Sequence, residues 1–270
     1  MTIPRPELGR SPAADPLVAR LRAAGCVFAE DEARLLREAE STGGDLESLV
    51  ARRVAGEPLE QVVGWAEFCG LKISVAPRVF VPRRRSELMV REAVRLLADA
   101  PAASVVVDLC CGSGAIGAAI THAVPGVELH AADVEPAAVE VAARNIERFH
   151  GQAHLGDLFA ALPPRLRGRV RAMAANAPYV PSEEIALMPL EARVHEPLSA
   201  LDGGRDGLDI QRRVAAEAGE WLAPGGWLLI ETSKHQSPYT AALVSAAGLD
   251  TYVRRDAEIG GTVVVGRRTG

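Results

Sequence analysis

The 270-residue sequence lacks a basic excess and lacks any long apolar run. Thirty Lys and Arg face 35 Asp and Glu, and the net charge is −5. This balance argues against a protein whose main activity is to bind nucleic acid, because phosphate binding usually needs a surplus of positive charge. No apolar run reaches membrane-spanning length, and "MTIPRPELGR" lacks the apolar core of a signal peptide. We therefore expect no membrane binding and no direct binding of nucleic acid.

Cysteine is also scarce, with four residues in the chain. Cys26 and Cys69 stand alone, whereas Cys110 and Cys111 are adjacent, and adjacent cysteines rarely bridge each other. None of these spacings is typical of a metal site. We expect reduced thiols in a cytoplasmic protein and no bound metal.

The chain is nevertheless 48% hydrophobic, which is ample for a sizeable core. Residues 1–64 are predicted to form the helical domain. Its first 14 residues, with three prolines, indicate a loose tail, and helical patterns run from Asp15 to about Val63, for example "DLESLVARRVAG", which Asp45 could cap. Two strand-like runs follow in residues 65–82 and predict a β-hairpin. Residues 83–270 have a different pattern, in which strands and helices alternate. The sequence thus predicts a small helical domain, a linking hairpin and one large α/β domain.

The large domain reads as a doubly wound, mostly parallel sheet. Seven strands are predicted, in "SVVVDL", "VELHAAD", "QAHLGDLF", "VRAMAAN", "WLLIETS", "DTYVRRD" and "GTVVVGRR". The helix "LDIQRRVAAEAGEWL" is expected to stop at "APGG", before the fifth strand. No helix separates the last two strands, so we expect them to pair antiparallel.

A glycine-rich turn, "DLCCGSGAIG", follows the first of these strands. Asp108 ends the strand, and Gly112, Gly114 and Gly117 allow a tight turn and close approach of a ligand to the backbone. Asp133 ends the next strand, where it could accept hydrogen bonds from a ribose diol or could cap the helix that follows. Because the glycines fit G-x-G-x-x-G, a nicotinamide-dependent oxidoreductase or a nucleotide-binding domain without catalysis is an alternative at this point.

The fourth strand is followed by "NAPYVP", which is poor strand material. A methyltransferase that acts on a planar nitrogen has a use for such a motif. The side-chain carbonyl of Asn176 and the backbone carbonyl of Ala177 could accept the two N–H groups of an amide, and Tyr179 could cover the substrate or a cationic sulfonium. The chemistry would rest on positioning and electrostatics.

From about Glu57 to the C-terminus the sequence resembles the protein-(glutamine-N5) methyltransferases of the HemK/PrmC type, which modify peptide-chain release factors. The segments that carry the resemblance are "GEPLEQVVGWAEFCGLKISVAPRVFVPRRRSE", "VVVDLCCGSGAIG", "HAADVEPAAVEVAARN", "GDLF", "NAPYVP", "VHEPLSALDGGRDGLD" and "DAEIGGTVVVGRR". The resemblance implies a Rossmann-like class I fold that uses S-adenosyl-L-methionine (AdoMet), behind a helical domain that docks the protein substrate. It also implies a glutamine acceptor, such as that of the Gly-Gly-Gln motif of a release factor.

Carried over residue by residue, the resemblance implies two groups of site residues. The expected cofactor-binding residues are Asp108, Cys110, Cys111, Gly112, Ser113, Gly114, Asp133, Leu158 and Asn176. The expected catalytic and substrate-binding residues are Asn176, Ala177, Pro178 and Tyr179. The chain departs from the family pattern where Cys110 replaces a glycine, where Ala177 replaces the first proline of N-P-P-Y, and in a shorter N-terminal region.

Within the same fold, a nucleic-acid adenine-N6 methyltransferase is the alternative, because it shares an Asn-Pro-Pro-Tyr-type motif. The acidic balance and the hairpin segment count against it. The basic run "PRRRSE" could meet an acidic or RNA-associated partner or could be a solvated loop. Glu231 and His195 are interpreted as structural. We expect a monomer whose partner is a protein with an exposed glutamine.

Overall fold

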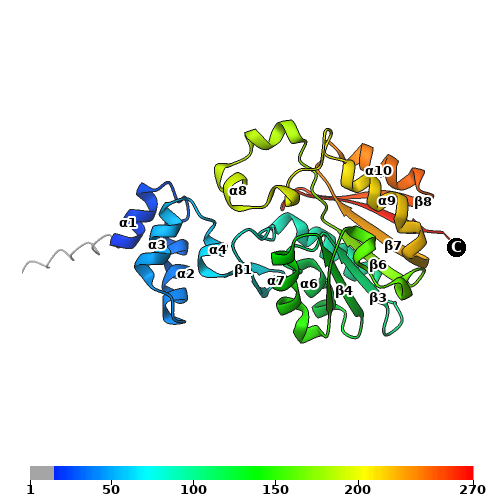
Figure 1. Cartoon of the computed structure of the whole chain (residues 1–270), viewed down its shortest axis with the longest axis horizontal. Helices are drawn as coiled ribbons and strands as arrows, with labels where there is room; N and C mark the ends of the chain where they lie inside the picture. Colours follow the sequence, from blue (N-terminus) through cyan, green and yellow to red (C-terminus); the bar gives the residue numbers. More distant parts are fainter. Residues whose placement is uncertain (1–14, 270) are drawn as a thin grey trace, which may run out of the picture. The chain divides into compact units, whose positions relative to one another are not determined.

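The computed structural model describes residues 15–269 and divides the chain into two compact units between Val63 and Gly64 (Figure 1). Residues 1–14 of the predicted helical domain lie outside the described residues. The hairpin belongs to the second unit, together with the α/β domain.

The first unit consists of helices α1 (Pro16–Ala23), α2 (Ala29–Ser41), α3 (Leu46–Val54) and α4 (Leu59–Val63). Asp45 caps α3 as predicted, since its carboxylate accepts a hydrogen bond from the Ser48 amide at 3.0 Å. Asp15 caps α1 in the same way through the Leu17 amide. Apolar side chains of these helices form their own cluster, centred on Leu21, Leu36 and Val50. The first unit therefore has a hydrophobic core of its own.

The second unit opens with the predicted hairpin. Strands β1 (Trp65–Phe68) and β2 (Leu71–Ser74) pair antiparallel through a two-residue turn. Both turn residues have positive φ, 49° at Cys69 and 72° at Gly70, which matches the right-handed twist of the two strands. Phe68 and Ile73 are buried in the same cluster as the first helix of the α/β domain.

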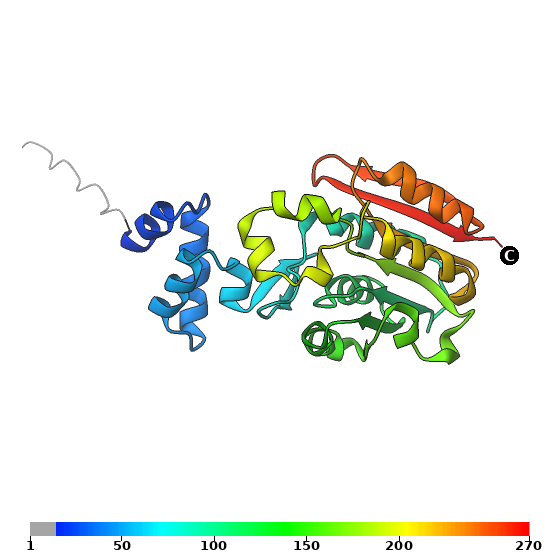
Figure 2. The same cartoon turned by 45° about the horizontal axis from the view of Figure 1, so that its top comes forward.

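The α/β domain contains the expected seven-stranded mixed sheet (Figure 2). Its strands are β3 (Val105–Leu109), β4 (Glu128–Asp133), β5 (Gln152–Leu155), β6 (Val170–Ala175), β7 (Leu222–Glu231), β8 (Leu249–Asp256) and β9 (Gly261–Arg268). The order across the sheet is β5-β4-β3-β6-β7-β9-β8. The first five strands are parallel, and β9 is antiparallel to both β7 and β8.

Helices cover both faces of this sheet. They are α5 (Glu87–Leu96), α6 (Ala115–Ala123), α7 (Pro136–Ile146), α9 (Asp209–Trp221) and α10 (Ser237–Ala246), whereas α8 (Leu190–His195) adds no residue to the buried clusters of the sheet. Side chains of α5, α6 and α7 share one buried cluster with the sheet, and those of α9 and α10 share a second cluster on the other face. The sheet is thus enclosed on both sides, as apolar parallel strands require.

Strand β7 differs from its prediction. It begins at Leu222, before the "APGG" that was expected to form the preceding turn. Val170 pairs with Leu222 and Ala172 pairs with Trp227, so residues 223–226 form a bulge within the strand. Gly225 has φ of 71°, and a Cβ on Gly226 would lie 2.7 Å from the carbonyl oxygen of Val170. The two glycines therefore permit the bulge where the sequence suggested a stop.

Candidate active site

The candidate site lies at the carboxyl edge of the sheet, where β3, β4 and β6 end side by side. Leu109 pairs with Ala132 on one side and with Ala175 on the other. The parallel register therefore brings the next residues, Cys110, Asp133 and Asn176, to the same edge. After β3 the chain adds β4 and β5 on one side of the sheet, and after β6 it adds β7 on the other side. The edge between β3 and β6 is therefore the topological switch point of the fold.

The glycine-rich turn between β3 and α6 is held by its own backbone. The Cys111 amide donates to the Ala132 carbonyl at 3.1 Å, and the Gly114 amide donates to the Cys111 carbonyl at 2.8 Å. Gly112 and Gly114 have φ of 54° and 72°. A Cβ at Gly114 would lie 3.0 Å from the Cβ of Ala142 on α7, so both the conformation and the close packing favour glycine here.

Cys110, which replaces a glycine of the family pattern, has φ of 53°. The turn therefore keeps a left-handed residue at this position, although a side chain with a Cβ is strained there. Burial raises the pKa of the Cys110 thiol well above its usual range. The thiol stays protonated at neutral pH and is a poor nucleophile.

Asp133 joins the turn to the second strand. Its Oδ2 accepts a hydrogen bond from the Gly112 amide at 2.8 Å, and its Oδ1 accepts one from the Glu135 amide at 3.0 Å. The side chain is partly exposed, and each oxygen has a second lone pair for a ligand hydroxyl. The alternative that Asp133 caps the following helix is wrong, because Glu135 stands at the N-cap of α7 and that helix has no side-chain capping bond. The carboxylate instead supports the turn, and it can also face a ribose.

Asp108 occupies a different place from the other predicted cofactor residues. Its side chain is fully buried beneath the turn, and its Oδ2 accepts from the Gly117 amide at 2.8 Å. Its Oδ1 has no hydrogen-bond partner in the described structure, and burial raises its pKa to about 8. Asp108 thus supports the first turn of α6 from below, and its assignment to the cofactor-binding residues stays a prediction.

The segment "GDLF" completes the cofactor side of the site. The Gly156 amide donates to the Asp133 carbonyl at 3.0 Å, which draws this segment against the end of β4. Leu158 begins a short 3-10 turn with φ of 47° and is buried. The apolar side chain of Leu158, close to the predicted ribose acceptor Asp133, suits the face of an adenine.

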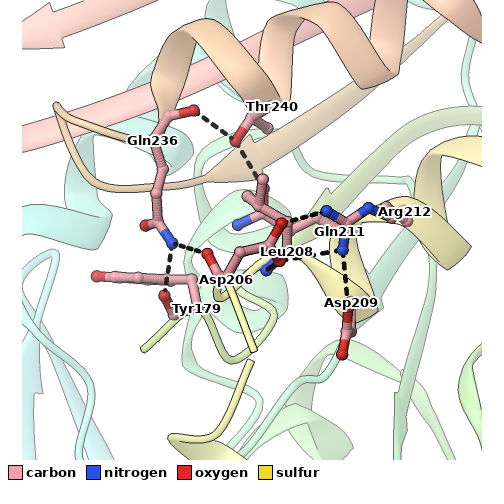
Figure 3. Close-up of polar contacts among 8 residues, drawn as sticks. All are labelled: Tyr179, Asp206, Leu208, Asp209, Gln211, Arg212, Gln236 and Thr240. Atoms are coloured by element: carbon pink, nitrogen blue, oxygen red, sulfur yellow. Dashed lines mark hydrogen bonds and ion pairs between the residues drawn. The ribbon is translucent and has the colours of Figure 1, made fainter. Parts of the chain in front are cut away.

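The motif "NAPY" directly follows β6. Asn176 and Tyr179 are partly exposed, whereas Ala177 and Pro178 are buried. The Tyr179 carbonyl accepts a hydrogen bond from Nε2 of Gln236 at 2.9 Å, and the same nitrogen donates to the Asp206 carbonyl at 3.2 Å (Figure 3). One amide group therefore fixes the motif to the segment that precedes α9.

That segment, residues 201–209, also pairs with the motif through its backbone. The Val180 amide donates to the Leu201 carbonyl, and the Gly203 amide donates to the Val180 carbonyl. Gly207 has φ of 75°, and a Cβ there would lie 2.3 Å from both the Tyr179 carbonyl oxygen and Nε2 of Gln236. The glycines of "LDGGRDGLD" thus let this segment approach the motif closely, while Gln236 itself carried no signal in the sequence.

The Tyr179 side chain contacts an ion pair between the buried Glu231 and the partly exposed Arg85. Its hydroxyl donates to Oε1 of Glu231 at 3.4 Å, and Nε of Arg85 donates to the same oxygen at 3.2 Å. The Glu231 side chain is 1% exposed, which agrees with its structural interpretation, but its contact with Tyr179 was not expected. Burial, followed by the charge of Glu231, raises the pKa of Tyr179 to about 12. The ring is therefore neutral at any ordinary assay pH.

The basic run "PRRRSE" is used mostly inside the fold. Arg83 pairs with the buried Glu196 and Arg85 with Glu231, whereas Arg84 is exposed. Two of the three arginines are thus committed to internal carboxylates. Within residues 15–269 no group of three or more His, Cys, Asp or Glu side chains could hold a metal ion, and no described helix is long and apolar enough to cross a membrane.

Comparisons with known proteins agree with this geometry. The family model "Methyltransferase small domain" matches residues 86–191. Over 225 residues the chain is 38% identical to the release factor glutamine methyltransferase of Geobacter sulfurreducens, covering 82% of this chain and 77% of that protein. The chain belongs to the release factor glutamine methyltransferase family. The homologue of the same name from Gloeobacter violaceus is 42% identical over 205 residues, covering 74% of this chain and 70% of that protein.

The chain is also similar to an enzyme of another name. A 4-amino-L-phenylalanine/4-methylamino-L-phenylalanine methyltransferase of Streptomyces pristinaespiralis is 35% identical over 203 residues, covering 74% of this chain and 69% of that protein. Among solved structures, a methyltransferase from Pyrococcus furiosus aligns with a TM-score of 0.56 at 16% identity, covering 82% of this chain and all of that one. The fold is that of class I AdoMet-dependent methyltransferases, which confirms the predicted class.

Family membership supports AdoMet as the cofactor, and the residues present fit it. Asp133 offers free lone pairs to a diol, the turn of residues 110–114 allows close approach of a ligand, and Leu158 offers an apolar contact. The individual residue assignments remain predictions.

Proposed function

We propose that this protein methylates the side-chain amide nitrogen of a glutamine in a peptide-chain release factor, with AdoMet as the methyl donor. The observation that carries the proposal is the position of Asn176 and Tyr179. They follow β6 at the edge where the predicted cofactor residues Cys110 and Asp133 also lie, and Gln236 and Glu231 hold Tyr179 there.

When bound, AdoMet supplies an electrophilic methyl group on a sulfonium. The work of the chain is to present the amide nitrogen, which is a weak nucleophile because its lone pair is delocalised into the carbonyl. The side-chain carbonyl of Asn176 accepts one N–H and the backbone carbonyl of Ala177 accepts the other, so that the lone pair is directed toward the methyl group. Pro178 restricts Ala177 to an extended conformation and so limits the directions that this carbonyl can take.

The proton of the alkylated amide needs no strong base from the protein, because alkylation makes it acidic enough to leave to water. Two titratable side chains, one in the motif and one beneath the turn, are not suited to act as a strong base. The Tyr179 hydroxyl is protonated, with a pKa of about 12, and the Asp108 carboxyl is buried beneath the turn. Positioning and electrostatic complementarity are therefore the expected sources of catalysis.

The test is single-turnover methyl transfer to a release factor, with AdoMet saturating and the modified glutamine located by mass spectrometry. The Asn176→Ala variant should be slower by about 10²–10³-fold, the usual effect of removing one fixed polar group that acts in the transition state. The Asn176→Asp variant keeps an acceptor of the same shape and should be impaired less.

Two controls make the result specific. The same release factor with alanine in place of its Gly-Gly-Gln glutamine should accept no methyl group, and thermal unfolding should show that the Asn176 variants fold. Transfer to 4-amino-L-phenylalanine, but not to the release factor, would instead favour the chemistry named for the Streptomyces relative. A near wild-type rate for Asn176→Ala would show that the motif is only a loop.

A further inference from the structure

Two arginines of the segment 83–85 each pair with a buried glutamate, Arg83 with Glu196 and Arg85 with Glu231. Both glutamate side chains are 1% exposed, and in the described structure the Oε2 of each has no hydrogen-bond partner. The arginine side chains stay 35% and 42% exposed, so the cost of removing charge from water falls mainly on the two carboxylates and offsets much of the attraction. Net stability is therefore a weak reason for either pair.

The two pairs differ in the second donor to the shared carboxylate oxygen. In Glu196 this donor is the backbone amide of Val81, at 3.4 Å. In Glu231 it is the hydroxyl of Tyr179, also at 3.4 Å. The guanidinium carbon of Arg85 also lies 5.8 Å from the centre of the Tyr179 ring, within the range of a cation–π contact. The pair of Arg85 and Glu231 thus contacts Tyr179 of the predicted substrate-binding motif.

Tyr179 is consequently held at three points by three parts of the chain. Its hydroxyl contacts Glu231 at the end of β7, its ring lies near Arg85 ahead of α5, and its carbonyl accepts from Gln236 ahead of α10. Two of these contacts hold the side chain and the third holds the backbone that carries it, which restricts where the ring can lie. This is the support that a side chain needs if its orientation matters for a reaction.

We infer that Arg85 and Glu231 are positioning residues, which orient the Tyr179 ring toward the substrate amide and balance each other's charge beside the cofactor site. The inference rests on the proposed function. Glu231 provides the acceptor for the tyrosine hydroxyl, and Arg85 provides a planar cation for the ring. Because the two charges cancel, the pair adds no net positive charge beside the place where a cationic sulfonium is to bind.

The experiment compares Glu231→Gln with Glu196→Gln, which alters an equally buried glutamate that pairs with the same segment but does not meet Tyr179. We expect similar losses of thermal stability in the two variants. The kcat of Glu231→Gln should fall by about tenfold with KM for the release factor nearly unchanged, as for an interaction that acts in the transition state. The kcat of Glu196→Gln should stay within about twofold of wild type.

A double-mutant cycle then asks whether Glu231 acts through Tyr179. Tyr179→Phe removes the shared hydroxyl, and we expect the double variant with Glu231→Gln to be no slower than the slower single variant. Effects that multiply would overturn the inference, and so would a Glu231→Gln enzyme that behaves like Glu196→Gln. If Glu231→Gln fails to fold, Arg85→Lys, which loses the planar donor but keeps the charge, takes its place in the same cycle.

A binding measurement keeps this inference separate from the proposed function. Glu231→Gln leaves the Arg85 charge unbalanced, so it should weaken the cationic AdoMet relative to the neutral S-adenosylhomocysteine, by about threefold for one uncompensated charge near a surface site. Calorimetry gives this ratio without any methyl acceptor. A wild-type enzyme that transfers no methyl group to glutamine would refute the proposed function. An unchanged ratio of AdoMet affinity to S-adenosylhomocysteine affinity in Glu231→Gln would refute the role of Glu231 in charge balance.

Discussion

Replacing Asp133 by alanine should weaken AdoMet binding strongly. The carboxylate already accepts from the amides of Gly112 and Glu135 at 2.8 and 3.0 Å, and its remaining lone pairs are available to the ribose hydroxyls. Hydrogen bonds to a charged acceptor contribute roughly 1.5–3 kcal/mol. We therefore expect the dissociation constant of AdoMet to rise by about 10- to 150-fold.

The same substitution should also lower the free energy of unfolding of the cofactor-free protein, because both backbone amides lose their acceptor. The expected cost is roughly 1–3 kcal/mol of the free energy of unfolding. Asp133→Asn separates the two effects. It keeps an acceptor of nearly the same shape for one amide and loses the negative charge, so its stability should lie closer to that of the wild type than its AdoMet affinity does.

Calorimetric titration with AdoMet and denaturant unfolding without ligand are the two assays. The reasoning predicts that affinity and stability both fall in Asp133→Ala, and that affinity falls further than stability in Asp133→Asn. An Asp133→Ala protein that is less stable but binds AdoMet within about twofold of wild type would refute the ribose assignment. Asp133 would then be only a support of the glycine-rich turn.

Three further predictions concern stability and substrate docking. Burial raises the pKa of Asp108 to about 8, above its value of 3.8 in the unfolded chain, so its contribution to folding is fully present below about pH 4 and is lost as pH rises to about 8. The melting temperature should therefore fall between about pH 4 and pH 8, and less so in Asp108→Asn. Cys110→Gly should relieve a left-handed residue with a Cβ and stabilise the protein by about 1 kcal/mol, measured by denaturant unfolding, whereas a loss of stability would show that thiol packing outweighs the strain. Removing residues 1–63 should leave AdoMet affinity intact, since the second unit has its own cores, but should abolish methylation of the release factor; full activity of the shortened chain would exclude a docking role for the helical unit.

The parts of the fold that follow from local patterns could be predicted from the sequence. The seven strands, the hairpin and the Asp45 cap each depend on residues close together in the chain, such as the valines of β3 or the Asp–Leu–Glu–Ser start of α3. The candidate site followed in part for the same reason. Once the strands are parallel, residues that come just after them meet at one edge, and Cys110, Asp133 and Asn176 are such residues.

The contacts that hold the site could not be predicted in this way. Gln236 reaches Tyr179 across 57 positions of sequence, and Arg85 reaches Glu231 across 146. Neither contact is marked by composition or periodicity, because it depends on how loops from different strands converge. The bulge at the start of β7 was missed for a related reason, since proline and glycine in "APGG" are typical of a turn, and the pairing with β6 decided otherwise.

The strand order has a consequence for how the chain folds as it is synthesised. β9 follows β8 in sequence but lies between β7 and β8. Until residues 261–268 have left the ribosome, β7 has no partner on that side, and β8 has no sheet to join. The interval leaves an apolar strand edge, with Leu228, Leu229 and Ile230, open to pairing with other chains. Val263, Val264 and Val265 close that edge, so the joining of β7 and β8 into one sheet waits for a segment that is synthesised after both of them.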